Sequence, residues 1–323
     1  MAPNILCDPA LFEKDLTGMV MVVTGANSGI GLVTSKQLSK QGATVILACR
    51  NPEKGEVAAE EVGGVFLKLD LASLDSVKEF VSAFKKDYDR LDVLVNNAGV
   101  MMCPYAETVD GFEIQFGANH LGHFLLMRLL TPMLLETAEK TGKPSRFLAL
   151  SSCAATDFPG GYQGYPWINF DDLMSSADKY DTEFAYGQSK LANYLHATEA
   201  GERYPADKLI SVSLHPGWVY TPLDTHIFEK TLGTNIIARS VTSLIRNILY
   251  YTGFMLTPWI GIQSTFQCIL ADDIQSGKFY SQQGMYRDPT RKPGGWPMDL
   301  GNIKVMPGDG AKLWEVSEKL VGL

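Results

Sequence analysis

The stretch TGANSGIG, residues 24–31, decides the fold because it stands between an apolar run and a helix-like pattern. The run MVMVVTGA, residues 19–26, is short and continuously apolar, as expected of a strand buried on both faces of a sheet. Gly25 permits a tight turn, and Gly29 and Gly31 let the backbone approach a pyrophosphate. The N-terminus of the following helix would offer unpaired N–H groups to phosphate. We therefore predict a dinucleotide-binding turn here.

Apolar runs alternate with amphipathic stretches beyond this turn. The further strand candidates are residues 43–50, 65–71, 91–99, 146–152 and 209–217. Helical patterns separate them, as residues 73–88 do between the third and fourth strands. This alternation predicts right-handed βαβ units, and hence an α/β fold with a Rossmann-type, doubly wound parallel sheet flanked by helices. Since no linker-like composition divides the chain, residues 1–323 are expected to form a single domain.

Two segments depart from the alternation. Residues 154–185 are rich in Gly, Pro and aromatic residues and are interpreted as an insertion above the sheet. Residues 236–262 form an apolar helical segment that contains Arg239 and Arg246. Glycine and proline interrupt it, whereas a membrane-spanning helix needs roughly twenty apolar residues in succession. The region 228–262 is therefore interpreted as a lid over a substrate pocket or as an amphipathic segment that faces a membrane surface.

The composition excludes several classes of protein. The apolar share of 46% and the charged share of 20% are ordinary for a globular chain. A net charge of −8 without a basic stripe argues against a nucleic-acid surface. The five scattered cysteines lack C-x-x-C spacing, which favours a reducing compartment over a disulfide scaffold or zinc ribbon. No secretory signal pattern is present, so an intracellular location is expected, in the cytoplasm or on the cytosolic face of a membrane.

The residues at the end of the second strand candidate indicate which nicotinamide dinucleotide the site prefers. A free ribose 2′-hydroxyl usually meets a carboxylate there, but this strand ends in Cys49, Arg50 and Asn51. The Arg50 guanidinium can pair with a 2′-phosphate, and Ser28 and Asn51 can add donors. NADP(H) is therefore favoured over NAD(H). Asp70, which closes the third strand, is expected either to accept a hydrogen bond from the adenine amino group or to cap a helix.

Six motifs together resemble the short-chain dehydrogenase/reductase family. In the family's order they are TGANSGIG (24–31), NNAG (96–99), NHLG (119–122), SS (151–152), YGQSK (186–190) and HPG (215–217). Closer in, residues 96–126 and the stretch YGQSKLAN look like the retinol dehydrogenase branch, whose members are NADP-linked and act on retinoids and similar lipophilic carbonyls. The C-terminal KLWEVSEKLVGL looks equally like light-dependent protochlorophyllide oxidoreductase, although that branch typically reads YKDSK where this chain reads YGQSK.

The resemblance implies a catalytic group of Asn119, Ser152, Tyr186 and Lys190. Tyr186 would exchange a proton with the substrate oxygen, which Ser152 (or Ser151 in its place) would hold beside the phenol. Because tyrosine titrates near pH 10, the charges of Lys190 and of the nicotinamide are expected to lower its pKa. The four-residue spacing puts Tyr186 and Lys190 on one helix face. By the family pattern Asn119 would anchor a water in a proton relay from Lys190, or act only as a structural bridge.

The expected cofactor contacts come from four of the six motifs, from the residues just after HPG and from the ends of the second and third strand candidates. They are Gly25, Asn27, Ser28, Gly29, Ile30, Gly31, Arg50, Asn51, Asp70, Leu71, Asn97, Ala98, Gly99, Tyr186, Lys190, Pro216, Gly217, Val219 and Thr221. The insertion is expected to line the substrate pocket, or to be exposed loop filler; the lining candidates are Phe158, Tyr162, Tyr165 and Trp167. No metal is expected, because His120 and His123 lack further ligands and are interpreted as helix packing.

These observations favour an NADP(H)-dependent oxidoreductase, similar to retinol dehydrogenases, that interconverts lipophilic alcohols with aldehydes or ketones. Two other interpretations stay open: a light-dependent protochlorophyllide reductase, and a cofactor-binding scaffold or redox sensor without turnover. The intact Ser152, Tyr186 and Lys190 argue against the scaffold. The expected partner is a lipophilic small molecule and not a nucleic acid. A homodimer and a peripheral membrane contact are both compatible with the sequence.

Overall fold

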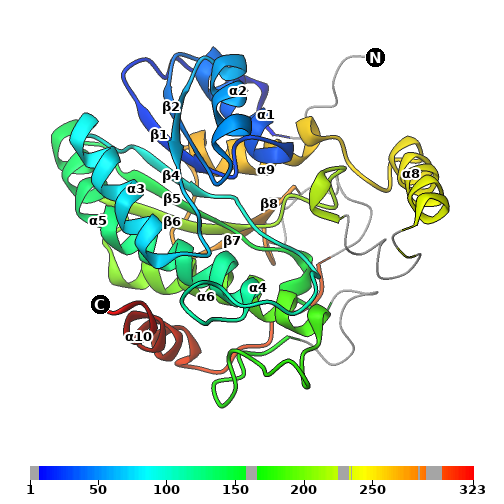
Figure 1. Ribbon diagram of the computed structural model, residues 1–323. Helices are drawn as coiled ribbons and strands as arrows, with labels where there is room; N and C mark the ends of the chain where they lie inside the picture. The colour runs from blue at the N-terminus through cyan, green and yellow to red at the C-terminus, as the bar shows by residue number, and fades with distance from the viewer. Residues whose placement is uncertain (1–6, 158–165, 225–232, 234, 283, 289–299) are drawn as a thin grey trace.

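The computed structural model describes residues 7–157, 166–224, 233, 235–282, 284–288 and 300–323. Within them one eight-stranded sheet has the order β3-β2-β1-β4-β5-β6-β7-β8 (Figure 1). The strands are β1 (Val20–Thr24), β2 (Thr44–Cys49), β3 (Val65–Lys68), β4 (Val93–Asn96), β5 (Ser145–Leu150), β6 (Leu209–Leu214), β7 (Phe279–Ser281) and β8 (Gly284–Met285). All neighbours are parallel except β7 and β8. The order, which reverses between β1 and β4, confirms the predicted Rossmann-type α/β fold.

Helices cover both faces of the sheet (Figure 1). One face carries α1 (Gly29–Lys40), α2 (Pro52–Val62) and α9 (Pro258–Leu270), and the other carries α3 (Leu74–Asp87), α5 (Gly122–Thr141) and α6 (Thr182–Arg203). α10 (Asp309–Val321) packs on α6 and α5 from outside, and α8 (Ile236–Tyr251) stands apart from the sheet. The short helical turns are α4 (Ile114–Phe116), a π-helical turn (Gly117–Leu121) and 3-10 turns at Pro9–Phe12, Cys153–Ala155 and Pro222–Asp224.

Successive strand residues alternate between two apolar clusters, one on each face of the sheet. Met21 and Val23 belong to the cluster that includes α9, while Val22 belongs to the cluster that includes α5 and α6. This period of two follows from the pleat of a strand. Because helices cover both faces, β4 and β6 are buried along their whole length and β1 along all but its first residue. That burial explains why these strands appear in the sequence as continuous apolar runs.

The expected strands are all present, and two more complete the sheet. β7 and β8 have only three and two residues, too few for an apolar alternation to be detected from sequence. The apolar segment 236–262 is not one helix, since α8 ends at Tyr251 and α9 begins at Pro258 after its N-cap residue Thr257. Among the described residues no helix is both long and apolar enough to cross a membrane.

The insertion ends where α6 begins. Of the insertion, residues 154–185, the first two residues belong to the 3-10 turn Cys153–Ala155 and the last four form the first turn of α6. Residues 156–157 and 166–181, the other described residues of the insertion, contain turns and bends and neither helix nor strand. The Gln188 side chain of α6 holds the insertion at two points: Oε1 accepts from Asn169 N at 2.8 Å, and Nε2 donates to Leu173 O at 3.1 Å. Asp181 then caps α6 by accepting from two backbone N–H groups of the first turn. The insertion therefore leads directly into the helix that carries YGQSK.

Candidate active site

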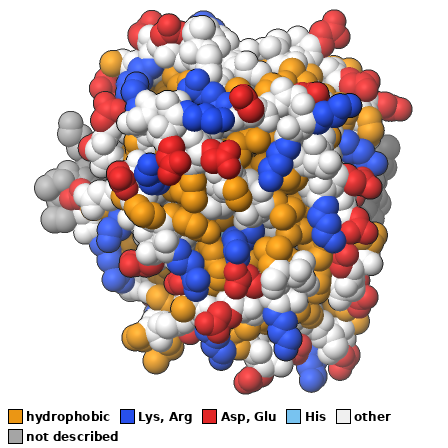
Figure 2. Space-filling view, turned by 90° about the vertical axis from the view of Figure 1, so that its left-hand side faces the viewer, with side chains coloured by type: hydrophobic (Ala, Val, Ile, Leu, Met, Phe, Trp, Pro, Cys, Tyr) orange, Lys and Arg blue, Asp and Glu red, His pale blue; other side chains and the backbone are white. Residues whose placement is uncertain are grey.

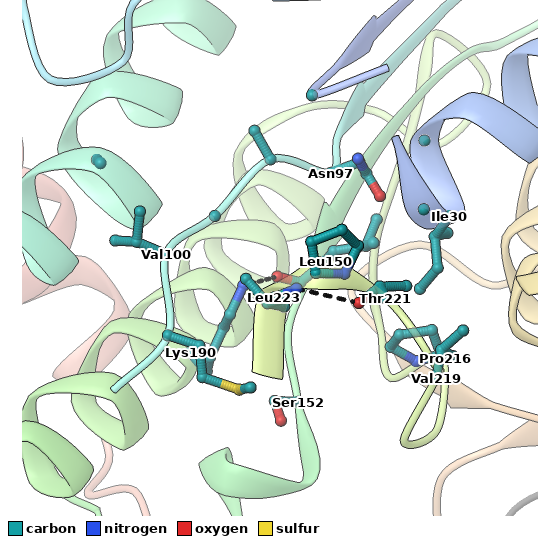
Figure 3. Close-up of a pocket in the computed structure, with 18 of the residues that line it drawn as sticks. Ile30, Asn97, Val100, Leu150, Ser152, Lys190, Pro216, Val219, Thr221 and Leu223 are labelled. Carbon is teal, nitrogen blue, oxygen red and sulfur yellow. Dashed lines mark hydrogen bonds between the residues drawn. The ribbon is translucent and has the colours of Figure 1, made fainter. Parts of the chain in front are cut away.

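A cavity of about 880 Å³ opens at the carboxyl ends of the parallel strands. Its lining includes the turn after β1, the ends of β2 and β3, and the loops after β4, β5 and β6. Figure 3 shows labelled side chains from several of these segments around one space. Ligands of open α/β sheets bind in this place, next to the point where the strand order reverses. All the predicted cofactor and catalytic residues line the cavity except Asn51 and Asn119.

The turn after β1 forms a backbone cradle at one end of the cavity. Gly25 and Gly29 have φ angles of 65° and 56°, which favour glycine. A Cβ on Gly31 would lie 2.6 Å from both Gly25 O and Asn97 Nδ2. The N-cap residue of α1, Ser28, makes no side-chain capping bond, and the first N–H groups of a helix have no partner within it. This open, glycine-lined helix start fits the pyrophosphate of a dinucleotide.

Thr24, at the end of β1, joins the cradle to the loop after β4. Its hydroxyl oxygen accepts from the N–H groups of Asn97 and Ala98, each at 2.9 Å. The same hydroxyl lies 2.9 Å from His123 Nε2, and His123 Nδ1 lies 3.0 Å from the carbonyl oxygen of Asn119. Burial lowers the pKa of His123 to about 3, so the ring is neutral. Because a carbonyl only accepts, Nδ1 donates to Asn119 and Thr24 donates to Nε2. His123 is thus hydrogen-bonded as well as packed.

The nucleotide end of the cavity is built by the ends of β2 and β3. Arg50 lines it and is exposed. Asn51 caps α2 instead, since its Oδ1 accepts from a backbone N–H of the first turn at 2.9 Å. Asp70 lines the cavity, and its Oδ1 accepts from Ala72 N at 3.0 Å. The residue that caps α3 is Ser73, so the interpretation of Asp70 as a helix cap is wrong.

Ser152, Tyr186 and Lys190 line the cavity together, from the end of β5 and from α6. Tyr186 and Lys190 are each only 4% exposed, and Lys190 Nζ lies 5.7 Å from the phenol ring centroid. Nζ donates to Leu150 O at 3.1 Å (Figure 3). Ser152 Oγ accepts from Ala154 N at 3.1 Å, and the Ser152 hydroxyl is the side-chain group that lowers the pKa of Tyr186 against the larger rise from burial. The Ser151 hydroxyl donates to Lys190 O at 2.7 Å, which favours Ser152 as the hydroxyl beside Tyr186.

Burial dominates the electrostatics of this pair. It raises the pKa of Tyr186 well above the usual value near 10, and the hydrogen bond from Ser152 offsets only part of the shift. Burial also lowers the pKa of Lys190 to about 8. The pKa of Tyr186 is therefore raised in the protein itself, because burial removes the phenolate from water. The expected lowering relies on the nicotinamide charge as well as on Lys190. The phenol keeps its proton at neutral pH.

Asn119 is fully buried in the π-helical turn before α5. Its side chain pairs with Val100 in both directions: Oδ1 accepts from Val100 N at 2.8 Å, and Nδ2 donates to Val100 O at 2.9 Å. Nδ2 also donates to Ser189 Oγ at 2.9 Å. The side chain therefore bridges the loop after β4 to α6. The Asn119 backbone carbonyl accepts from His123 Nδ1 at 3.0 Å. Asn119 lies within a π-helical turn, and such turns are frequent at functional sites.

The loop after β6 covers the cofactor end of the cavity. The predicted residues Pro216, Gly217, Val219 and Thr221 all line it. A Cβ on Gly29 would lie 2.9 Å from Thr221 Cγ2, so this loop reaches the cradle. Arg246 of α8 donates to Thr221 O at 2.8 Å. The loop is thereby held between the cradle and α8.

The aromatic residues of the insertion contribute less than expected to the described cavity. Phe158, Tyr162 and Tyr165 lie outside the described residues. Trp167 is 50% exposed, packs on Phe184 with ring centroids 4.6 Å apart, and is not part of the cavity lining. Apolar residues that were not predicted individually line the cavity instead, among them Val100, Met101, Met102, Ile114, Ala118 and Trp218. Phe254, which also lines it, belongs to the segment 228–262 that was interpreted as a lid. The run VMM, residues 100–102, directly after NNAG was the available signal for the first three.

The same arrangement of motifs occurs in known proteins. A model of the short chain dehydrogenase family matches residues 19–165. Retinol dehydrogenase 13 of Mus musculus is 37% identical, over 96% of this chain and 86% of its own length. The chain belongs to the short-chain dehydrogenase family. Retinol dehydrogenase 12 of Bos taurus is 36% identical, over 96% of this chain and 89% of its own length. Within the family the chain therefore lies in the retinol dehydrogenase branch.

A solved structure supports the family assignment of this short-chain dehydrogenase. The crystal structure of an uncharacterized protein from Mycobacterium Paratuberculosis has a TM-score of 0.69 and 31% identity, and the likeness covers 96% of this chain and 95% of that one. Membership makes the protein an oxidoreductase that uses a nicotinamide cofactor. Among its described residues no group of three or more His, Cys, Asp or Glu side chains is arranged to hold a metal ion.

Proposed function

We propose that this short-chain dehydrogenase interconverts lipophilic alcohols with aldehydes or ketones and uses NADP(H) as its hydride carrier. The observation that carries the proposal is one cavity in which the glycine cradle, the group of Ser152, Tyr186 and Lys190, and an apolar wall all take part. The relatives named retinol dehydrogenases support a retinoid-like substrate.

The apolar wall suits a lipophilic substrate. Val100, Met101 and Met102 follow the cofactor loop directly, and Ile114 and Phe254 join them in the lining. Pockets of this kind bind a ligand chiefly through apolar contact and orient it through a few polar groups. Methionine side chains are unbranched and adapt to irregular shapes. A long hydrocarbon substrate could therefore lie against this wall with its oxygen at Ser152.

The polar residues have distinct parts in the reaction. When bound, the nicotinamide supplies a hydride to the carbonyl carbon or takes one from the alcohol carbon. In reduction, Tyr186 transfers its phenolic proton to the carbonyl oxygen as the new C–H bond forms, so that the product is the alcohol; oxidation reverses both transfers. Ser152 holds the same oxygen by a hydrogen bond. The Lys190 ammonium favours the phenolate that Tyr186 becomes after giving up its proton.

Replacement of Tyr186 by Phe tests the catalytic assignment. The substitution removes the proton donor, so kcat/KM for all-trans-retinal with NADPH should fall by about 10²-fold or more, while NADPH affinity is retained. The rate is followed as loss of nicotinamide absorbance. Tyr194→Phe, on the same helix but outside the cavity lining, is the matched control. Wild-type turnover by Tyr186→Phe, or no turnover of any aldehyde or ketone by the wild type, would contradict the proposal.

The preference for NADP(H) rests on Arg50. Arg50 directly follows β2 and lines the same cavity as the cradle residue Ser28, and no carboxylate closes this strand. A guanidinium recognises phosphate by two parallel hydrogen bonds. The 2′-phosphate of NADP(H) is the group that would meet it, since the pyrophosphate fits the start of α1.

Replacement of Arg50 by Asp tests this preference. A carboxylate repels the 2′-phosphate and accepts from a free 2′-hydroxyl, so the dissociation constant for NADPH should rise at least about tenfold while that for NADH falls. Nicotinamide fluorescence titrations measure both constants. Lys54→Asp makes the same change of charge in α2, outside the cavity lining, and controls for long-range charge. Equal NADPH affinity in Arg50→Asp and the wild type would refute the assignment.

A further inference from the structure

Helix α8 exposes a row of large apolar side chains. Val241, Leu244, Ile248 and Tyr251 are 38%, 61%, 51% and 83% exposed. They follow one another at intervals of three or four positions, which places them along one side of the helix. In Figure 1 this helix stands at the right-hand edge, apart from the sheet. We refer to these four residues as the α8 stripe.

The other side of α8 is fastened to the body of the protein. Arg246 donates to Thr221 O at 2.8 Å, and its guanidinium carbon lies 4.5 Å from the ring centroid of Tyr220. The ring of Tyr250 lies 5.2 Å from the same ring, and Ala238 is buried. α8 therefore has a defined inner side, and the stripe belongs to the outer side.

The surroundings of the stripe carry little charge. Residues 231–270 contain no Asp, Glu or Lys, and their only charged residues are Arg239 and Arg246, although the chain as a whole has a net charge of −8. Arg246 is turned inward to Thr221. By contrast, the face of the molecule in Figure 2 mixes acidic and basic side chains with apolar ones. The stripe therefore suits an apolar medium better than a charged partner.

The stripe is continuous with the mouth of the cavity. Phe254 lies three positions after the last stripe residue and lines the cavity. Leu223 also lines the cavity and is 38% exposed. Its N–H donates to Thr221 Oγ1 at 3.4 Å (Figure 3), and Thr221 O is the group that α8 holds through Arg246. Leu223, at the mouth of the cavity, is thus linked to α8 through Thr221. An apolar molecule at the stripe has an apolar route past Phe254 and Leu223 into the cavity.

The area of the stripe distinguishes between two possible binding partners, a lipid bilayer and a second copy of the chain. A helix of 16 residues is about 24 Å long and about 10 Å wide, so its outer side covers on the order of 240 Å². A stable protein interface buries about 800 Å² on each partner. Amphipathic helices, however, bind a bilayer by sinking a single apolar face to a shallow depth. The area favours the bilayer.

We propose that the α8 stripe inserts into the surface of a lipid bilayer and that substrate enters the cavity from there. The entry of substrate rests on the proposed function, whereas the insertion of the stripe does not. Tyr251, with an apolar ring and a polar hydroxyl, suits the depth of the headgroups. Since the stripe is uncharged, binding needs no anionic lipid and changes little with salt.

Flotation with vesicles of phosphatidylcholine alone tests the insertion. The wild type should float with the vesicles both at about 0.1 M and at about 1 M salt. Joint replacement of Leu244 and Ile248 by Ser should lower the partition coefficient at least about tenfold, because it removes two apolar groups of the stripe. Joint replacement of Val57 and Val109 by Ser, at sites 66% and 81% exposed and away from α8, should change nothing. A wild type that stays unbound, or a stripe variant that floats equally, overturns the proposal.

A kinetic comparison tests the entry of substrate. The stripe variant should keep the wild-type kcat/KM for a water-soluble short-chain aldehyde but lose at least about tenfold with retinal held in the vesicles. Equal rates with vesicle-held retinal would overturn entry through the stripe. A wild type that floats but reduces neither substrate would leave the insertion standing and reject the proposed function. If vesicles are not bound and the stripe variant instead converts a dimer to a monomer in light scattering, the stripe is an interface between copies and the proposal is wrong.

Discussion

Lys190 is a buried residue of α6 whose amine donates to the carbonyl oxygen of Leu150 at the end of β5. Burial lowers its pKa from 10.5 to about 8. Between these values the unfolded chain binds more protons at this residue than the folded chain does, so the free energy of unfolding that it contributes rises as pH increases from about 8 to about 10.5. Below pH 8 the full cost of burying the Lys190 ammonium is subtracted from the free energy of unfolding. Lys190 therefore lowers the stability of the fold but places a positive charge beside Tyr186, and functional sites are often destabilising in this way.

Replacement of Lys190 by Met should raise the free energy of unfolding at pH 7 by about 1–3 kcal/mol while abolishing turnover. The carbonyl of Leu150 would still accept from Asn193 Nδ2 at 3.0 Å, so no buried acceptor loses its last partner. The stability gain over the wild type should shrink as pH rises toward about 10.5. Urea unfolding of both proteins at several pH values measures it. A difference that is constant across this range would contradict the buried-charge explanation.

At the scale of one element, the start of α1 shows how a helix terminus becomes a binding surface. The side chain of Ser28 leaves the first turn uncapped, whereas Asn51, Ser73 and Asp181 cap α2, α3 and α6 with their side chains. The difference is physical: an uncapped N-terminus keeps its N–H groups available for phosphate. Because Gly31 has no Cβ, the Gly25 carbonyl oxygen and the Asn97 side chain can pack closely against this helix start.

Replacement of Gly31 by Ala should distort the glycine turn before α1. The new Cβ would meet Gly25 O and Asn97 Nδ2 at 2.6 Å, and the backbone oxygen cannot move without displacing the turn. We expect the dissociation constant for NADPH to rise at least about tenfold, as measured by fluorescence titration. Gly142→Ala, at the C-cap of α5, strains the backbone only through its φ of 67°, since a Cβ there meets nothing within 4 Å. It lies outside the cavity lining and should leave NADPH affinity unchanged. Equal NADPH affinities in the Gly31→Ala and Gly142→Ala variants would contradict the assignment of the glycine turn as the pyrophosphate site.

At the scale of the whole molecule, α10 joins the C-terminal residues to α5 and α6. Trp314 is 3% exposed and packs edge-on against Phe124 with centroids 5.1 Å apart. The guanidinium groups of Arg128 and Arg203 lie 5.1 and 4.7 Å from its ring. α10 therefore covers part of the outer side of both helices. A homodimer that paired through these helices would have to accommodate or displace α10.

Replacement of Trp314 by Ala should lower the free energy of unfolding by about 3–5 kcal/mol, because a large buried ring leaves a cavity. It should also promote association of the chain, since apolar side chains of α5 and α6 lose their cover. Urea unfolding and light scattering measure the two effects. Trp167→Ala, at a ring that is 50% exposed, should cost about 1 kcal/mol or less. A small loss in both variants would show that α10 adds little to stability.

The order of the first six strands and the helices between them, the glycine turn and the positions of Ser152, Tyr186 and Lys190 could all be predicted from the sequence. These features are local: a continuous apolar run reports a strand covered on both faces, and a spacing of four reports one helix face. Such signals need only neighbouring residues. The position of Asn119 in its motif was equally visible in NHLG.

Only the tertiary structure decided what surrounds those residues. Asn119 turns its side chain to Val100 and Ser189, which are 19 and 70 positions away. Asn51 caps a helix rather than facing the cavity, and Trp167 packs on Phe184. The pKa values of Tyr186 and Lys190 also depend on burial by distant segments. Burial and hydrogen-bond choice are properties of the packed chain, because desolvation depends on every atom that comes near and not on the order in which residues are joined.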